Sequence, residues 1–229
     1  MSTILALDTA TEACSVALLY QGQRFFSDEL SPRTHTQRIL PMIDELLHQA
    51  GISIKEVDYL AFGRGPGSFT GVRVSVGIAQ GLALGADLPV IPISNLQMMA
   101  EAAFQQTGAK DVIALIDARM NEVYFAQFRL SEQGWQEVVE EQVCSPEKAV
   151  AQIRQVDGAV VVGTGWATYP QFAQADLKVK VSDISLPSAQ FMLPLAEQAI
   201  LAGNVQTAID VEPVYLRNEV TWQKLPHKR

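Results

Sequence analysis

Short apolar runs alternate along the chain with longer stretches in which apolar residues recur at helical spacing. The short runs are bounded by polar or glycine-containing turns, a pattern that predicts strands. In the first half, strands are expected at residues 4–7, 14–20, 24–30, 59–62 and 89–93. Helices are expected at residues 34–50, from the loop 63–71 to about residue 85, and at 95–105. Thr34 and Gln37 have the spacing of a capping box, and Pro41 is expected to kink or divide the first helix.

The second half repeats this order of elements. Strands are expected at residues 112–116, 123–128, 135–139 and 159–162, and helices from residue 145 and over 188–202. Asp8 follows the first strand of the first half, as Asp117 follows the first strand of the second. The pattern predicts an old duplication of β-β-β-α-β-α units. We expect an N-terminal lobe of residues 1–106 and a C-terminal lobe of residues 107–229, with the last helix and tail free to pack back on the first lobe.

The composition is that of a folded chain that does not by itself attract polyanions. Of 229 residues, 48% are apolar and 18% are charged, which excludes a disordered chain. The net charge of −8 disfavours direct RNA binding, and only the tail, residues 217–229, is locally basic. The charge-free runs are too short to span a bilayer, and the start of the chain lacks the basic region of a signal peptide. We therefore expect a cytoplasmic protein with no membrane contact.

The helix that follows the loop 63–71 is apolar on two sides. Val72, Val76 and Ala79 share one face, and Gly77 and Gly81 form part of a smooth ridge of small residues. A helix buried on all sides within the monomer explains this composition, and so does a subunit interface. In the second case, the helix 34–50 contributes further apolar residues, namely Leu40, Ile43 and Leu47. Val76→Glu is then expected to abolish dimers and to leave the fold intact.

The glycine-rich loop invites comparison with phosphate-binding loops because it joins a strand to a helix N-terminus. It lacks the Gly-Lys-Ser/Thr ending of a Walker loop and the third glycine of a dinucleotide-binding loop. A tight turn that brings the next helix close to its neighbours is the structural alternative. Both interpretations stay open for the candidate nucleotide- or phosphate-facing residues, which are Asp8, Thr9, Gly65, Gly67 and Asp117.

No cluster of metal ligands or catalytic side chains stands out. Cys14 and Cys144 are far apart and are expected to be buried free thiols, and the three histidines are scattered. No metal, no cofactor and no catalytic residue is therefore expected.

Several segments together resemble a known family. They are residues 7–10, 33–43, 116–119, 213–217 and, most specific, Gly65-Pro66-Gly67-Ser68-Phe69-Thr70-Gly71-Val72-Arg73. The Asp-Thr turn and the duplicated lobes resemble the actin, sugar-kinase and heat-shock ATPase superfamily. The whole set looks like the TsaB (YeaZ) family, which takes part in making threonylcarbamoyladenosine in tRNA. The resemblance implies an α/β fold of two duplicated lobes, of the actin, sugar-kinase and heat-shock ATPase type.

The resemblance also implies a role. It implies a non-catalytic subunit that stabilises and positions the transferase TsaD together with the ATPase TsaE, forms a homodimer when alone, and meets tRNA only indirectly. Catalytic relatives carry a His-x-x-x-His pair where this chain has Asn95 and Met99, which are poor metal ligands. The implied partner interface comprises Arg33, His35, Leu40, Ile43, Leu47, Val72, Arg73, Val76, Gly77, Ala79 and Gly81.

Two rival functions remain. The first is a nucleotide-binding phosphotransferase or ATPase of the same superfamily that uses Asp8 and Asp117. The second is a peptidase, although the chain contains neither a Gly-x-Ser-x-Gly nor a His-Glu-x-x-His motif.

Overall fold

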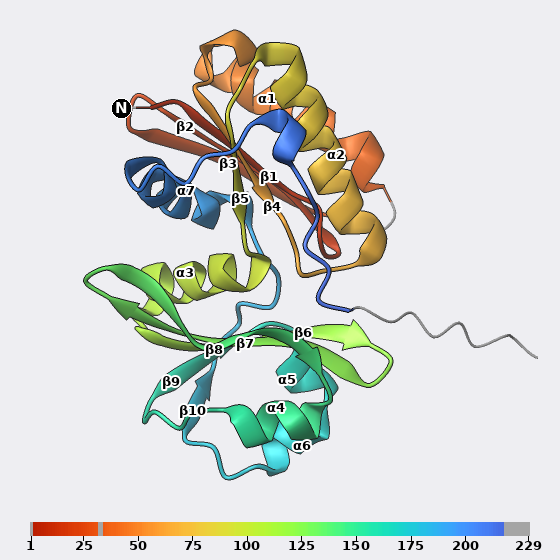
Figure 1. The fold of residues 1–229 in the computed structure, drawn as a ribbon, viewed down its shortest axis with the longest axis vertical. Coiled ribbons are helices and arrows are strands. Elements are labelled where there is room, and N and C mark those ends of the chain that lie inside the picture. Colours follow the sequence, from red (N-terminus) through yellow and green to blue (C-terminus); the bar gives the residue numbers. More distant parts are fainter. Residues whose placement is uncertain (1, 32–33, 218–229) are drawn as a thin grey trace, which may run out of the picture.

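The structure, a computed structural model, describes residues 2–31 and 34–217, and this part forms two five-stranded sheets, one above the other in Figure 1. The first sheet has the order β3-β2-β1-β4-β5 and the second β10-β9-β6-β7-β8. The strands of the first sheet are β1 (Ile4–Asp8), β2 (Ala13–Tyr20), β3 (Gln23–Leu30), β4 (Tyr59–Gly63) and β5 (Val90–Ile93). Those of the second are β6 (Asp111–Arg119), β7 (Glu122–Ser131), β8 (Gly134–Cys144), β9 (Ala159–Val162) and β10 (Val179–Val181).

The two sheets share one topology, which confirms the predicted duplication. In the first, β1 pairs antiparallel with β2 and parallel with β4; in the second, β6 pairs antiparallel with β7 and parallel with β9. Strand β8 is longer than the predicted 135–139 because its pairing with β7 extends to Cys144. The sequence did not predict β10, whose three residues leave no readable alternation of apolar and polar positions.

Helices α1 (His35–Ala50) and α2 (Phe69–Ala86) cover the outer face of the first sheet (Figure 1). Helix α1 lies on β2 and β3, and α2 lies on β4 and β1. Pro41 does not divide α1; its ring is exposed, so water can satisfy the carbonyl that loses its backbone partner. The predicted capping box is wrong as well, because the Thr34 hydroxyl lies 2.5 Å from the Ser31 hydroxyl and caps no helix N–H.

Helices α3 (Asn95–Thr107) and α7 (Met192–Leu201) fill the space between the sheets, and each packs away from its own half of the chain. Helix α3 leaves β5 and rests mainly on β6, whereas α7 follows the second sheet and rests on β5, β1 and β4. Met99 packs with the second sheet, while Met98 packs with the first. This position explains why α3 is buried on nearly all sides.

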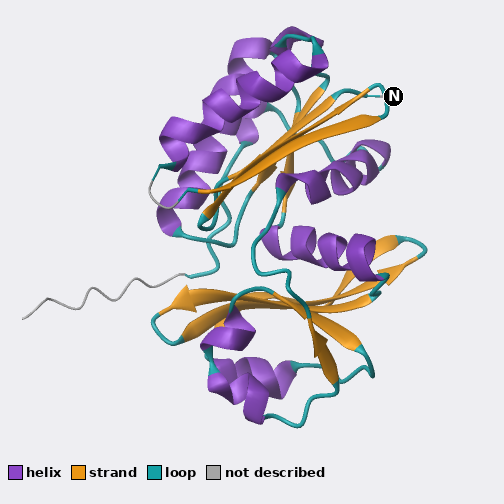
Figure 2. Ribbon diagram, turned by 180° about the vertical axis from the view of Figure 1, so that it is seen from behind, coloured by secondary structure: helices purple, strands orange, loops and turns teal. Residues whose placement is uncertain are grey.

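The outer face of the second sheet carries α4 (Pro146–Gln152), α5 (Gly165–Thr168) and α6 (Pro170–Gln174), as Figure 2 shows from behind. Three short 3-10 helices complete the fold: η1 (Ile54–Glu56), η2 (Ala189–Phe191) and η3 (Ala208–Asp210).

After η3, the C-terminal segment crosses from the first sheet's helices to the second sheet (Figure 1, blue). The Val214 N–H donates to the Arg64 carbonyl at 3.0 Å. The Arg217 guanidinium donates to the Ala118 carbonyl at 3.1 Å and forms an ion pair with Glu122.

By length and composition alone, α2 is apolar enough to cross a membrane, although 33% of its residues are buried within the protein. The helix lies against β4, β1 and η3, with Val72, Val76 and Ala79 in the core. The core therefore accounts for the apolar residues on one side of α2, and the opposite side does not face the core.

Candidate functional site

The glycine-rich loop between β4 and α2 lies directly on the turn between β1 and β2. A Cβ atom on Gly67 would lie 2.3 Å from the Ala10 carbonyl oxygen, and one on Gly71 would lie 2.2 Å from the Thr9 carbonyl oxygen. The Ser68 N–H donates to the same Ala10 carbonyl at 2.7 Å. Glycine is needed at these positions because one backbone approaches another, which favours the tight-turn interpretation of the loop.

Asp8 is fully buried and holds this loop in place through Asn95. The Asn95 side-chain amide donates to Asp8 Oδ1 at 2.8 Å, and Asn95 Oδ1 accepts from the Gly65 N–H at 3.0 Å. Burial raises the pKa of the Asp8 carboxyl to about 6, although the Asn95 hydrogen bond acts in the opposite direction. Thr9 is buried too, and its hydroxyl donates to the Gly71 carbonyl at 2.7 Å.

Contrary to expectation, Asp117 does not follow the first strand of the second sheet but lies near the end of β6, where it stabilises the start of the turn to β7. Its Oδ1 accepts from the Tyr169 hydroxyl at 2.7 Å and from the Arg119 N–H at 2.9 Å. Its Oδ2 lies 3.1 Å from the Arg119 guanidinium. The fold thus engages both aspartates in internal bonds at two separate turns.

The positions that carry metal ligands in the implied alignment are also engaged internally. Asn95 binds Asp8 and Gly65, and Met99 is fully buried in the core. Within residues 2–31 and 34–217, no group of three or more His, Cys, Asp or Glu side chains is placed to hold a metal ion. Cys14 and Cys144 are buried free thiols, as predicted, and burial raises the pKa of Cys14 to about 12.

The inner face of the helix pair belongs to the monomer's own core. Val72, Val76 and Ala79 are 2%, 8% and 0% exposed, and Ile43 and Leu47 pack in the same cluster. The expectation that Val76→Glu leaves the fold intact is therefore contradicted, because that substitution places a carboxylate among buried apolar side chains.

The outer face of α2 is nearly smooth, and no residue within 2–31 and 34–217 covers its glycines. Arg73, Gly77, Gly81 and Gly85 are exposed and spaced four residues apart, so they form one stripe, which we call the glycine ridge. A Cβ atom on any of these three glycines would meet no atom within 4 Å. Leu84, which is 61% exposed, lies beside the ridge.

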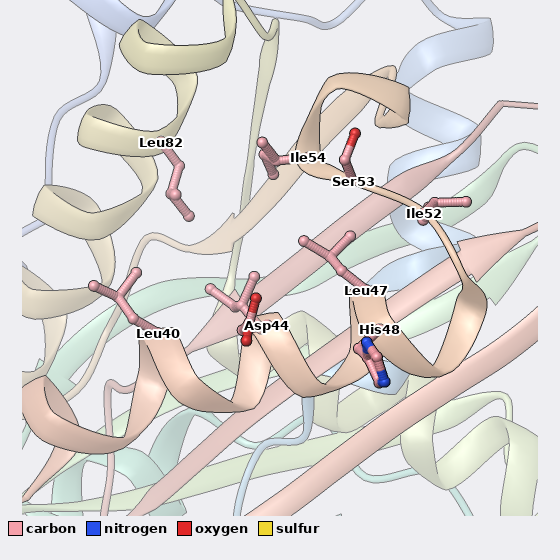
Figure 3. Close-up of a pocket in the computed structure, with 9 residues that line it drawn as sticks. Leu40, Asp44, Leu47, His48, Ile52, Ser53, Ile54 and Leu82 are labelled. Atoms are coloured by element: carbon pink, nitrogen blue, oxygen red, sulfur yellow. The ribbon is translucent and has the colours of Figure 1, made fainter.

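A groove of about 440 Å³ separates α1 from α2 (Figure 3). Its apolar walls come from α1, α2 and the segment around η1, with polar groups at the rim; the lining residues are Leu40, Ile43, Asp44, Leu47, His48, Ile52, Ser53, Ile54 and Leu82. Leu40 is 45% exposed at one end. Leu82 of α2 lines this groove, and the glycine ridge lies on the exposed side of the same helix.

The remaining candidate residues have varied positions. Arg33 and the basic residues after 217 lie outside the described residues. His35 is half-buried at the start of α1. Arg38 donates to Glu29 at 2.8 Å, and Arg64 donates to Glu141 at 3.0 Å, so these arginines are engaged within the chain.

Sequence reasoning missed Phe69, Leu84 and Tyr215, which are all exposed on or beside α2. Leu84 carries a signal that was available, since it lies on the side of α2 away from Val72 and Val76. Tyr215 carries none, because only the folded chain brings the C-terminal segment to α2.

Comparison with known proteins gives consistent matches over nearly the whole chain. A model of the TsaD family, described as tRNA N6-adenosine threonylcarbamoyltransferase, matches residues 27–222. The tRNA threonylcarbamoyladenosine biosynthesis protein TsaB of Haemophilus influenzae is 60% identical over 98% of this chain and 97% of its own length. The protein of the same name in Escherichia coli is 50% identical over 98% of this chain and 99% of its own length.

Solved structures agree with this. YeaZ from Pseudomonas aeruginosa superposes with a TM-score of 0.87 at 42% identity, covering 94% of this chain and 100% of that one. A structure from the same organism, of an uncharacterised protein with similarity to peptidase YeaZ, gives the same TM-score and identity. These matches confirm the duplicated two-lobe α/β fold.

Proposed function

The chain belongs to the TsaB (YeaZ) family, and from that premise we propose that it is a non-catalytic subunit required to form threonylcarbamoyladenosine next to the anticodon of tRNA. In this proposal it pairs with the transferase TsaD through α1 and α2, and the ATPase TsaE completes the assembly. Transfer chemistry and most tRNA contacts belong to TsaD, in the cytoplasm. Family membership supports the role in this biosynthesis. The division of roles between this chain and TsaD is supported by the exposed face of α2 and by the internal bonds of Asp8 and Asp117.

The observation that carries the proposal is the outer face of α2, which none of the described residues covers. A helix on the surface of a globular protein ordinarily has a polar outer side. This one presents Gly77, Gly81, Leu84 and Gly85 to solvent beside an apolar groove. Glycine side by side on a helix lets a second helix approach closely, so the face suits a protein partner that also fills the groove.

The identity of the partner is supported by the family comparison. Since the TsaD family model matches residues 27–222, TsaD shares this chain's fold and has a counterpart of the helix pair. Two proteins with the same fold can pair face to face in a pseudo-symmetric way. We propose that two copies of this chain use the same face when TsaD is absent.

A catalytic role is disfavoured because the two aspartates that a nucleotide enzyme of the superfamily would use are bonded within this chain. Asp8 is buried and bound to Asn95, and Asp117 is bound to Tyr169 and Arg119. These bonds stabilise the turns themselves. We therefore place the reaction on the partner.

The alternative is a phosphotransferase or ATPase that uses Asp8 and Asp117. Isothermal titration with ATP and Mg²⁺, followed by a phosphate-release assay, separates the two functions. The subunit proposal predicts no turnover by the chain alone, whereas turnover that is lost in Asp8→Asn supports the alternative.

A peptidase is disfavoured by the geometry of a groove where an aspartate, a histidine and a serine lie together. Asp44, His48 and Ser53 all line the groove, but the Ser53 hydroxyl donates to Glu56 at 3.1 Å. In Figure 3 the Ser53 hydroxyl and the His48 ring point apart. A serine nucleophile needs a hydrogen bond to its base, and this arrangement does not provide it.

The experiment that tests the proposal is omission of the chain from a reconstituted reaction. Purified threonylcarbamoyl-adenylate synthase, TsaD and TsaE are incubated with tRNA, threonine, bicarbonate and ATP, and the tRNA nucleosides are measured by mass spectrometry. The modified adenosine is expected only when this chain is present. An equal yield without it contradicts the proposed function.

A further inference from the structure

Arg73, at one end of the glycine ridge, stacks on one aromatic ring and lies beside a second. Phe69 begins α2, and Tyr215 comes from the C-terminal segment; their ring centroids are 6.0 Å apart at an interplanar angle of 32°. The Arg73 Cζ lies 3.1 Å from the Phe69 centroid and 4.9 Å from that of Tyr215. As seen from Cζ, these distances place the two centroids nearly at a right angle, so the guanidinium stacks on the Phe69 ring and has the Tyr215 ring at its side.

Stacking leaves the edges of the guanidinium available. Its only hydrogen bond within the described residues runs from Nη1 to the Phe69 carbonyl at 3.3 Å, and no carboxylate of that part of the chain pairs with it. A planar guanidinium presents parallel N–H groups, which match the two oxygens of a carboxylate or of a phosphate. Stacking on Phe69 restricts the Arg73 side chain before an anion binds, which lowers the entropy cost of binding.

The surrounding rings have the character of a protein interface. Phe69 is 62% exposed and Tyr215 is 42% exposed, so neither ring is needed to fill the core. Aromatic residues and arginine dominate the strongly binding centres of protein interfaces. Because Arg73 lies on the same stripe as Gly77 and Gly81, a helix that follows the ridge ends beside it.

A single carboxylate fits this place better than a nucleic acid. Binding of a polyanion requires several unpaired cations, and the chain's net charge is −8. Among the described residues, the other arginines near the loop and the C-terminal segment are paired: Arg64 with Glu141, and Arg217 with Glu122. Within that part of the chain, one unpaired guanidinium beside aromatic rings is suited to one acidic side chain.

We propose that Arg73, stacked on Phe69 beside Tyr215, is the receptor for one carboxylate on a helix of TsaD that lies along the glycine ridge. This inference rests on the proposed function, since it names a contact within that pairing. It assigns the C-terminal segment a part in partner binding, because Tyr215 supplies one wall of the receptor.

The test is the affinity of the full chain for TsaD, measured by isothermal titration calorimetry for Arg73→Ala, Arg73→Lys and Tyr215→Leu. Arg73→Ala is expected to weaken binding by about tenfold or more, because a charge-assisted bidentate bond is lost. Arg73→Lys is expected to recover little, since an ammonium group lacks the planar fork. Tyr215→Leu is expected to give a smaller loss. The matched control is Arg24→Ala, an exposed arginine on β3, which should bind like the wild type.

Two results overturn the inference: unchanged affinity in Arg73→Ala, or full affinity in Arg73→Lys. Gly81→Glu, which places a charged side chain on the glycine ridge, distinguishes failure of the Arg73 contact from failure of the whole pairing face. If Gly81→Glu abolishes binding and Arg73→Ala does not, only the receptor is refuted. If neither variant changes the affinity, the proposed pairing face itself is refuted.

A second arm measures tRNA binding by the assembled complex, and a third uses a chain that ends at Arg217. Loss of tRNA affinity in Arg73→Ala with unchanged TsaD affinity assigns the receptor to a phosphate and contradicts the proposal. The shortened chain is expected to bind TsaD with the same dependence on Arg73. If shortening removes that dependence, the tail is the ligand and the proposal is wrong.

Discussion

At the scale of single residues, Asp8 is a carboxyl group that the fold buries completely. Its Oδ1 is bound by Asn95, while its Oδ2 is buried and has no hydrogen-bond partner among the described residues. Burial without full hydrogen bonding favours the protonated acid, and the pKa of Asp8 rises from 3.8 to about 6. The group therefore links folding to pH.

The direction of that linkage is fixed by the raised pKa. Between about pH 4 and pH 6 the folded chain holds a proton that the unfolded chain has released, so the Asp8 contribution to stability declines as pH rises through this window. The whole effect is about 3 kcal/mol for a shift of about two pKa units. Asp8→Asn should remove this decline and leave the protein more stable than the wild type at pH 7.

Urea unfolding at a series of pH values from 4 to 8 measures this effect. The exposed Asp183→Asn serves as the control and should follow the wild-type pH profile. If Asp8→Asn also shows the wild-type decline, Asp8 is not the linked group.

The sequence predicted where Asp8 and Thr9 lie, directly after the first strand, and correctly offered turn formation as one interpretation. It did not predict Asn95 as the partner of Asp8. The two residues are 87 positions apart, and only the parallel pairing of β1, β4 and β5 brings the start of α3 beside the turn.

At the scale of elements, α2 contains glycines of two kinds. Gly71, in the first turn, has no room for a side chain because the Thr9 carbonyl lies against it. Gly77, Gly81 and Gly85 have open space on the outer face. Glycine in the middle of a helix weakens it, so the second kind is retained at a cost to the monomer.

Alanine at the two kinds of position should therefore act in opposite directions. Gly71→Ala is expected to lower the free energy of unfolding by about 1–3 kcal/mol through overpacking. Gly81→Ala is expected to raise it by about 0.5–1 kcal/mol through better helix propensity, and to weaken binding to TsaD. Thermal unfolding and titration calorimetry on the same two variants measure both effects. Stabilisation without loss of binding in Gly81→Ala means that no partner helix approaches the ridge.

The sequence predicted α2 and its two apolar sides but not which side faces inward. Val72, Val76 and Ala79 form the more regular apolar stripe, and the sequence indicated this stripe as part of the interface. The sheet takes that stripe, and the glycines with Leu84 remain outside. Periodicity reports the number of apolar faces of a helix, whereas the tertiary fold decides what covers each of them.

At the scale of the whole molecule, side chains from both sheets are tied together across the space between them. Glu141 of β8 accepts from the Ser94 hydroxyl and lies 3.0 Å from the Arg64 guanidinium. The Glu141 side chain is only 7% exposed, so this tie is largely shielded from water. A second tie, Arg119 with Glu12, is 75% and 53% exposed.

Loss of the buried Arg64–Glu141 ion pair should weaken the contact between the two sheets. Loss of the exposed Arg119–Glu12 ion pair should not. Glu141→Ala is expected to destabilise the protein by about 3 kcal/mol, since it leaves a partly buried Arg64 unpaired. Arg119→Ala should change stability by less than about 1 kcal/mol. Hydrogen exchange of residues 63–71 and 134–144 should increase only in Glu141→Ala. Equal exchange in the two variants contradicts the idea that burial makes this tie the stronger.

The duplicated fold was predictable because each half repeats the same order of strands and has an aspartate at or near the end of its first strand. The division at residues 106 and 107 stays a prediction. Helix α3 precedes that boundary yet packs mainly on the second sheet, and α7 follows it yet packs on the first. Such an exchange depends on long-range packing, which local hydrophobic patterns do not record.

The central claim, that the outer face of α1 and α2 serves tRNA modification, is tested most directly by one substitution in the reconstituted reaction. Gly81→Glu places a charge on the exposed ridge without entering the core, and Leu201→Glu places the same charge at a site on α7 that is 89% exposed. Both variants are expected to melt like the wild type. Only Gly81→Glu is expected to fail to support threonylcarbamoyladenosine formation, measured by nucleoside mass spectrometry. Full modification with Gly81→Glu would contradict the central claim.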